Sequence, residues 1–418
     1  MKKNVMRPWI FILLLACGPW AVCSAQDVKF SKYFSGGTLR LDCVREGNRE
    51  RDTVWVERWL DRSAEWHGSR TRLTDPFNNG EYRVEMRDGK SGKVLYSRGY
   101  SNLFREWRNT EEGKHGVKRF EETVLLPMPK KAVKIAFQHR VCKGREGYVF
   151  EDQTVVDFVP GQRELEFNYR IGEAVELELH GAPAQKVAVV IVAQGYNSPA
   201  DPQLRVDYYR LKENLFGQEP FASHREDFNV YGVFADVDAD YNTFGADRYL
   251  MTFSLWKLHD RLGTTPCDQI IIMVNNEKYG GGAIYNFYAV TSLNGYSKFV
   301  LPHELGHSFG GLADEYVDEE LSYGDIHVEQ AEPQEPNITN LKDFDSKWKS
   351  MLPPGTPVPT PDAQVSRNEC GPLGVYEGAG YASKGVYRPA MHCMMRDYAP
   401  FCPVCRQRLE DVFKLYTQ

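Results

Sequence analysis

The hydrophobic pattern changes character near residue 165, and this change limits the folds that the chain can adopt. Before it, short stretches rich in β-branched and aromatic residues alternate with turn formers such as residues 78–80. After it, residues 186–193 form a nearly continuous apolar run, which is typical of a strand buried on both faces. A chain of 418 residues is also long for one domain. We therefore expect two domains of different type.

The first region, assigned to residues 26–165, predicts a β-sandwich because its short strands show no helical periodicity. Its histidines His67, His115 and His139 have no partner at ligand spacing, so we expect a structural or binding role for this accessory domain. The predicted strands are residues 38–44, 53–60, 81–87, 94–100, 120–126, 132–139 and 148–158.

The second region, residues 166–418, alternates between helical and strand patterns, which predicts an α/β arrangement. Pro202 stands where a helix begins, a position that suits proline. A proline-rich excursion, residues 317–365, interrupts the pattern with a long loop. The chain as a whole is expected to be an α+β multidomain protein. The expected strands are 186–193, 228–234 and 270–274, and the expected helices are 201–216 and 249–262.

One short motif in the second region has the spacing of a metal site. His303 and His307 are four residues apart, so on a helix both imidazoles lie on one face and can bind one Zn²⁺. Glu304 lies beside the first imidazole, where it can act as general base on water that the ion activates. The alternative is a helix with two solvent-facing histidines and an ion-paired glutamate. The glycines 310–311 can end the helix, because glycine tolerates the left-handed conformation.

Residues 303–316 resemble the metzincin zinc peptidases and, within them, the igalysin family (IgA peptidase M64). In these families a third His or Asp ligand follows the glycine turn. The commonest spacing would end on Ala313, which cannot bind metal, so the resemblance implies Asp314 as third ligand, with Glu315 as the alternative. It also implies one catalytic zinc ion. The resemblance covers roughly residues 170–418 and implies a metzincin-like α/β zincin fold there.

A second part of the resemblance lies near the C-terminus, at residues 393–395. These residues resemble the methionine turn beneath the metal of metzincins, and Met395 is favoured over Met394 as its floor. Paired methionines also serve as core filling. Tyr398 follows, and the resemblance implies an oxyanion-stabilising or metal-binding role for it. The run 401–405 is similar to the igalysin pattern as well.

The glycine-rich segment 280–290 precedes the metal motif and predicts an edge strand over the cleft. A peptide substrate could join this strand through main-chain hydrogen bonds. The alternative is an ordinary glycine loop and strand. The segment 375–387, rich in Gly and Tyr, is expected to form the far wall.

Together these features predict a zinc-dependent endopeptidase that acts on polypeptide or glycoprotein substrates. One alternative is a protein- or glycan-binding surface protein with a slow or inactive zinc domain. The presence of Glu304 argues against it, because an inactive site does not need the base. A zinc hydrolase of non-peptide amides is the third hypothesis.

The N-terminus, residues 1–25, predicts a cleavable export signal. Lys2, Lys3 and Arg7 precede a short apolar run that is too short to span a bilayer, and small residues lead to a cut after Ala25. We favour plain cleavage over lipidation at Cys17. The protein is therefore expected to be secreted, periplasmic or at the cell surface, without a transmembrane segment.

Export permits disulfides, and the seven cysteines after residue 25 leave at least one unpaired thiol. Cys267, beside an apolar run, is favoured as the buried free thiol. Four late cysteines can form disulfides, which we favour, or a structural Cys₄ zinc site. They are Cys370, Cys393, Cys402 and Cys405.

The charge pattern excludes one class of partner. The formal net charge is −6 and no long basic block occurs, so we expect no nucleic acid. Asp236, Asp238 and Asp240 resemble the start of a calcium loop, but Tyr241 stands where the sharp turn needs glycine. A solvated acidic loop is favoured there, with a calcium ion as the alternative.

Overall fold

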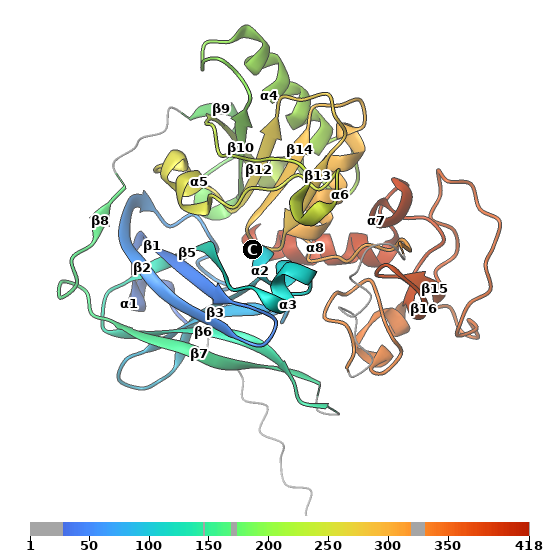
Figure 1. Ribbon diagram of the computed structural model, residues 1–418, viewed down its shortest axis with the longest axis horizontal. Coiled ribbons are helices and arrows are strands. Elements are labelled where there is room, and N and C mark those ends of the chain that lie inside the picture. Colours follow the sequence, from blue (N-terminus) through green and yellow to red (C-terminus); the bar gives the residue numbers. More distant parts are fainter. Residues whose placement is uncertain (1–27, 145–146, 169–173, 319–330, 418) are drawn as a thin grey trace, which may run out of the picture.

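The computed structural model describes residues 28–144, 147–168, 174–318 and 331–417. The predicted export signal, with Cys17 and Ala25, lies outside these residues. Figure 1 shows the N-terminal strands gathered beside a mixed sheet that helices cover, with β15 and β16 at the far side of that sheet. Among the described helices, none is long and apolar enough to cross a membrane.

The N-terminal part contains two four-stranded sheets with strand orders β5-β1-β2-β8 and β4-β3-β6-β7. All seven predicted strands are present, and most are longer than expected. Alternate residues of both sheets, such as Leu41 of β1 and Val84 of β3, point into one shared core. The strands are β1 (Phe34–Gly47), β2 (Asp52–Glu65), β3 (Tyr82–Asp88), β4 (Val94–Tyr100), β5 (Lys118–Pro129), β6 (Val133–Cys142), β7 (Tyr148–Phe158) and β8 (Glu166–Phe167).

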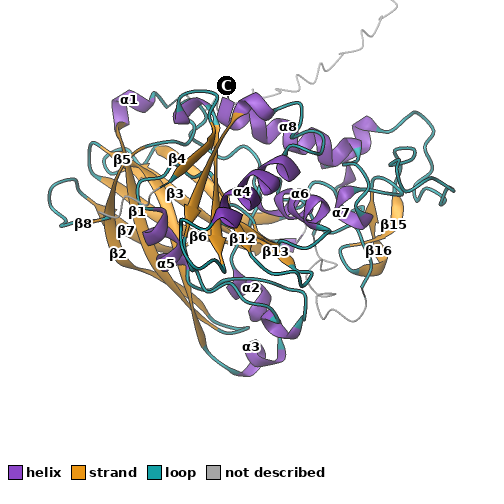
Figure 2. Ribbon diagram, turned by 90° about the horizontal axis from the view of Figure 1, so that it is seen from above, coloured by secondary structure: helices purple, strands orange, loops and turns teal. Residues whose placement is uncertain are grey.

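Three short helices in this part were not predicted: α1 (Phe30–Tyr33), α2 (Leu103–Trp107) and α3 (Glu111–His115). Each is too short to show a helical period in the sequence. Side chains cap the starts of α2 and α3, because Asn102 accepts a hydrogen bond from the N–H of Arg105 and Thr110 accepts one from the N–H of Gly113. Figure 2 shows α2 and α3 below the larger helices of the C-terminal part.

The C-terminal part is built on a six-stranded mixed sheet with the order β13-β14-β12-β10-β11-β9. Its inner strands are parallel, and the edge strands β9 and β13 run antiparallel to their neighbours. The strands are β9 (Val175–Glu178), β10 (Val187–Gln194), β11 (Phe228–Phe234), β12 (Gln269–Val274), β13 (Gly281–Ile284) and β14 (Tyr288–Ser292).

Strand β10 is buried on both faces, as its apolar run predicts. Val189 and Ile191 share a core with the helices α4 (Pro202–Leu215), α6 (Ser297–Ser308) and α8 (Pro403–Thr417). Val190 and Val192 share the opposite core with α5 (Leu255–Leu262) and with α2 of the N-terminal part. The N-terminal part therefore covers one face of the C-terminal sheet.

The helix predicted for residues 249–262 is wrong in its first half. Tyr249 and Met251 form isolated β-bridges with Gly281 and Asp240, so their backbone groups pair across strands instead of along a helix. Only α5 remains helical. Helix α4 follows the prediction, with Pro202 in its first turn and Asp201 accepting a hydrogen bond from the N–H of Gln203.

The remaining described elements of the C-terminal part are two strands, a short helix and several 3₁₀ helices. Strands β15 (Tyr376–Ala379) and β16 (Ala382–Arg388) pair antiparallel, and α7 (Met394–Asp397) follows them. The described residues of the predicted loop 317–365 pack through Phe344 and Trp348, which are both buried. The short 3₁₀ helices are η2 (Pro183–Gln185), η3 (Arg225–Asp227), η4 (Thr243–Gly245), η6 (Phe344–Ser346) and η7 (Trp348–Met351).

Candidate metal centre

Helix α6 carries His303, Glu304 and His307 and ends in a tight turn. Gly311 adopts a left-handed conformation, with φ of 63°, as expected for the turn glycine. Its N–H donates to the His307 carbonyl at 2.9 Å, and the N–H of Leu312 donates to the Gly306 carbonyl at 3.0 Å. The chain therefore reverses and runs back past the histidines.

Hydrogen bonds fix the tautomer of both imidazoles. Nδ1 of His303 lies 2.9 Å from the carbonyl oxygen of Met394, and Nδ1 of His307 lies 2.7 Å from that of Leu312. A carbonyl only accepts, so each Nδ1 is the protonated, donating nitrogen. In the neutral rings both Nε2 atoms therefore present lone pairs, the state that a metal ion requires.

Three acceptor atoms converge at the end of these rings. The Nε2 atoms of His303 and His307 are 3.2 Å apart, and Oδ1 of Asp314 lies 3.1 and 3.3 Å from them. Zinc bonds of about 2.0–2.1 Å in a tetrahedral site place neighbouring ligand atoms about 3.3–3.4 Å apart. Three lone-pair atoms at this spacing repel one another unless a proton or a metal ion lies between them, and the spacing and donor types fit zinc.

The electrostatics of the three groups favour a cation. Burial lowers the pKa of His307, but the carboxylate of Asp314 outweighs it and raises this pKa to about 9. Burial raises the pKa of Asp314, but the two imidazoles outweigh it and hold this pKa well below its usual range. The Tyr381 hydroxyl donates to Oδ2 of Asp314 and leaves Oδ1 directed at the imidazoles.

Glu304 is partly exposed and lines the cleft beside the histidines. Burial raises its pKa, and the two imidazoles counteract part of this effect. Gly281 of β13 leaves room for its side chain, because a Cβ atom at this glycine would lie 2.6 Å from Oε1 of Glu304 and 2.7 Å from Cγ1 of Val300. The edge strand therefore lies so near the carboxylate that this position has no room for a side chain.

The two residues expected near the methionine turn are close to this centre. Met395 is fully buried beneath α6, and a Cβ atom at Gly306 would collide with its Sδ and Cε atoms. The ring of Tyr398 packs edge-on to His303, with centroids 5.8 Å apart. Its hydroxyl bonds the hydroxyl of Tyr279, a contact that sequence reasoning missed.

Glu315, the alternative third ligand, points away from the histidines. Its Oε1 lies 3.1 Å from Sγ of Cys405 and accepts a hydrogen bond from Nδ2 of Asn337. The structure thus brings His303, Glu304, His307 and Asp314 together and separates Glu315 from them. The reason is the alternation of side chains along an extended chain, which sends neighbouring residues to opposite sides.

A cleft of about 550 Å³ opens in front of these residues. The edge strand β13 forms one side, as predicted for residues 280–290. Tyr381 lines the cleft from the segment 375–387, which was expected to form the far wall. The N-terminal part also contributes to the wall, which its sequence did not reveal. Its lining residues are Asn79, Gly80, Glu81, Ser101, Asn102, Arg105 and Glu106.

The acidic loop weighed as a calcium site has other partners. Asp238 pairs with Lys257 at 2.9 Å, and Asp247, at the twelfth position of the calcium-loop pattern, pairs with Lys278 at 2.7 Å. Within the described part of the chain, the groups of side chains close enough to hold a metal do not include this loop. Calcium therefore has no support from the structure.

A helix that directs two imidazoles and a carboxylate into an open cleft is the arrangement of a metal-dependent hydrolase. The protein-family model described as IgA Peptidase M64 matches residues 175–240, 235–371 and 363–413, and that described as Peptidase M64 N-terminus matches residues 29–150. The chain therefore belongs to the peptidase M64 family, a family of metalloendopeptidases, and this membership implies zinc. None of the curated proteins compared matches the chain.

Proposed function

We propose that the chain is an exported zinc endopeptidase that hydrolyses peptide bonds of protein or glycoprotein substrates. The observation that carries this proposal is the convergence of three acceptor atoms within 3.3 Å of one another at the cleft. In this proposal residues 166–418 form a metzincin-like catalytic domain. Residues 26–165 form a β-sandwich that helps to build the cleft, and residues 1–25 direct export.

His303, His307 and Asp314 are the proposed ligands of one zinc ion. The Nε2 lone pairs of the neutral imidazoles and the inward Oδ1 atom support this assignment. The position of Glu315 argues against Glu315 as the third ligand. Zinc supplies Lewis acidity, which acidifies water and polarises the substrate carbonyl. Three protein ligands leave room for water or substrate, as in catalytic zinc sites.

Glu304 is the proposed general base. It takes a proton from the attacking water and delivers it to the leaving amine as the peptide bond breaks. Tyr398, whose ring packs against His303, is the proposed stabiliser of charge on the carbonyl oxygen. Met395 supports α6 from below by packing on Gly306.

The proposed substrate is an extended polypeptide that adds to β13. This strand is the outermost of its sheet and borders the cleft, and its other edge already pairs with β14. Main-chain hydrogen bonds to an edge strand hold many peptide sequences equally well. Selectivity then falls to side chains of the cleft wall, including Arg105 and Glu106 from the N-terminal part.

Replacement of Glu304 by Ala tests the assignment directly. We expect the variant to retain zinc and to lose hydrolysis of a peptide library by about 10²–10⁴-fold, the usual contribution of a general base. Glu369→Ala, at an exposed surface position, is the matched control and should retain activity. Full activity in the Glu304 variant would refute the base. A zinc-loaded wild type without any hydrolysis would instead favour a non-catalytic binding role for the cleft.

A further inference from the structure

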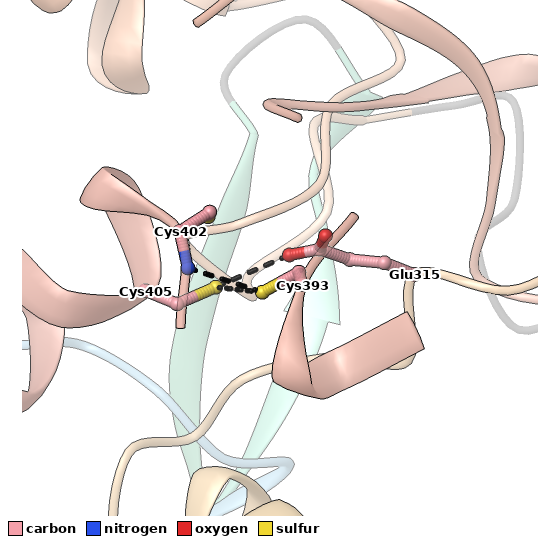
Figure 3. Close-up of side chains that lie close together, drawn as sticks. All are labelled: Glu315, Cys393, Cys402 and Cys405. Atoms are coloured by element: carbon pink, nitrogen blue, oxygen red, sulfur yellow. Dashed lines mark hydrogen bonds between the residues drawn. The ribbon is translucent and has the colours of Figure 1, made fainter. Parts of the chain in front are cut away.

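A second group of ligand-type side chains lies beside the metal centre, behind Asp314. It consists of Glu315, Cys393, Cys402 and Cys405, and their ligand atoms all lie within 4.8 Å of one another. Figure 3 shows that these four residues come together from three separate segments of the chain. We refer to them as the cysteine cluster. All four residues are fully buried, so the cluster is closed to solvent.

The spacing within the cysteine cluster fits a metal ion and does not fit a disulfide. The Sγ atoms of Cys393 and Cys405 are 3.7 Å apart, and Sγ of Cys405 lies 3.1 Å from Oε1 of Glu315. A disulfide needs a bond of about 2.05 Å. Zinc–sulfur bonds of about 2.3 Å in a tetrahedral site place sulfur atoms about 3.8 Å apart.

The expectation of disulfides among the late cysteines is therefore not met, since all of them are free thiols. Cys370 is also separate from the cluster, because its Sγ contacts the carbonyl oxygen of Pro400 at 3.3 Å. Glu315 takes the place that the predicted Cys₄ site gave to Cys370. The sequence could not reveal this exchange, because Glu315 stands far from the three cysteines along the chain.

Glu315 itself supplies an independent sign that a cation is needed. Its Oε1 accepts a hydrogen bond from Nδ2 of Asn337 at 2.9 Å, but its buried Oε2 has no hydrogen-bond partner among the described residues. Burial of a carboxylate oxygen without a donor is costly. A metal ion bound by this carboxylate and by sulfur atoms removes that cost.

We propose that the cysteine cluster binds a structural zinc ion through three thiolates and the carboxylate of Glu315. Thiolate ligands select zinc over magnesium or calcium, which prefer oxygen. Four protein ligands close the coordination shell, which distinguishes a structural site from a catalytic one. On binding, each of the three thiols releases its proton to solvent, and no oxidation or reduction takes place.

This ion would connect two parts of the catalytic cleft. Glu315 directly follows Asp314, and its N–H donates to the carbonyl of Met395 at 2.8 Å. Cys393 precedes Met394, whose carbonyl orients His303. The cysteine cluster therefore holds both the chain that carries Asp314 and the turn beneath α6, so its metal acts as a positioning element.

The first test is the zinc content of the His303→Ala/His307→Ala double variant of the mature chain. This variant removes the ligands of the proposed catalytic ion, so its result is separate from the proposed peptidase function. We expect one tightly bound zinc ion per chain, with an X-ray absorption spectrum dominated by sulfur ligands. Absence of zinc, or a shell of nitrogen and oxygen alone, would overturn the proposal.

The second test removes the cysteine cluster and leaves the histidines in place. Cys402→Ser/Cys405→Ser should lose one zinc ion relative to wild type, whereas Cys43→Ser, at an equally buried position, should retain all zinc. If the double variant does not fold, wild-type protein supplies the answer. A native mass with two zinc ions, together with three thiols that react only after chelation, supports the site. A mass with one zinc ion and two fewer hydrogens identifies a disulfide and refutes it.

Discussion

Single atoms outside the proposed zinc site control where the side chains of Asp314 and Glu304 point. The Tyr381 hydroxyl binds one oxygen of Asp314, so the other oxygen faces the imidazoles. The missing side chain of Gly281 leaves space for Glu304. Both residues act through a neighbour and do not contact the ion or the substrate carbonyl themselves, and each can be tested by removal or addition of one small group.

Tyr381→Phe removes the hydroxyl and should weaken zinc binding by about 10–100-fold, the range measured for outer-shell partners of metal ligands. Competition with a chelator measures the zinc affinity. Tyr387→Phe, on the strand β16 that follows Tyr381 but outside the cleft lining, is the control. Equal zinc affinity in wild type and Tyr381→Phe would show that the hydroxyl does not orient Asp314.

Gly281→Ala places a methyl group 2.6 Å from Oε1 of Glu304, so the carboxylate must move. We expect kcat to fall on the order of tenfold to a hundredfold while zinc content is unchanged, because misplacement of a catalytic group costs rate and not metal affinity. Gly295→Ala, where a Cβ atom meets nothing within 4 Å, is the control. A lower zinc content with unchanged kcat would contradict this role.

At the scale of elements, the turn after α6 decides whether Asp314, the proposed third ligand, reaches the histidines. Gly311 is left-handed, and its carbonyl accepts a hydrogen bond from Nδ2 of Asn79 at 3.2 Å. The helix end is thus fixed from both parts of the chain. The sequence predicted the turn glycine, but Asn79 could not be foreseen because it lies 232 positions away.

Gly311→Ala should destabilise the fold by about 1–2 kcal/mol, the cost of a left-handed alanine, and should also reduce zinc affinity. Gly355→Ala is a control with the same backbone strain, since its φ is also positive but a Cβ atom there meets nothing within 4 Å. Thermal unfolding and zinc titration of both variants separate the two effects. If both variants were less stable than wild type but bound zinc as tightly as wild type, the turn would have no special role in placing Asp314.

The sequence correctly predicted those elements that carry a local hydrophobic pattern. The alternating strands β1–β7 and the apolar strand β10 were all predicted correctly, because burial on one or two faces sets their composition. The helix expected at residues 249–262 failed because Tyr249 pairs with Gly281, a contact between distant residues. Contacts of this kind leave no local sequence period.

The residues of the candidate site also fall into two groups, those that local spacing predicted and those that contacts between distant segments bring in. His303, Glu304 and His307 lie on one helix, so their spacing alone indicated a metal site. The choice between Asp314 and Glu315 depended on the path of the chain after the helix, and local spacing left it open. Glu106 and Arg105 joined the cleft only through the packing of α2 on the C-terminal sheet.

At the scale of the whole molecule, the two parts form one cleft and are joined by direct bonds. Arg40 of β1 pairs with Asp260 of α5 at 2.7 Å, and Arg62 donates to the carbonyl of Gly263 at 2.9 Å. Closer to the cleft, the Tyr249 hydroxyl donates to Glu106 at 2.7 Å. We therefore expect the N-terminal part to be required for activity and for stability.

Glu106 gives this interface a pH dependence. Burial raises its pKa from 4.5 to about 7, so the folded protein retains a proton that the unfolded chain releases. The stabilisation is complete below pH 4.5 and is lost as the pH rises through about 7. In chelator-treated protein, the melting temperature of wild type relative to Glu106→Gln should therefore fall between these pH values. A constant difference would contradict the assignment, and Glu369→Gln should show no such trend.

The central claim is that His303, His307 and Asp314 hold one zinc ion in the cleft. Crystals of the zinc-loaded mature chain, measured at the zinc absorption edge, test it most directly. We predict an anomalous density peak at bonding distance, about 2.0–2.2 Å, from both Nε2 atoms and from Oδ1 of Asp314. A fully loaded crystal without a peak at this position, whatever density the cysteine cluster shows, would contradict the account.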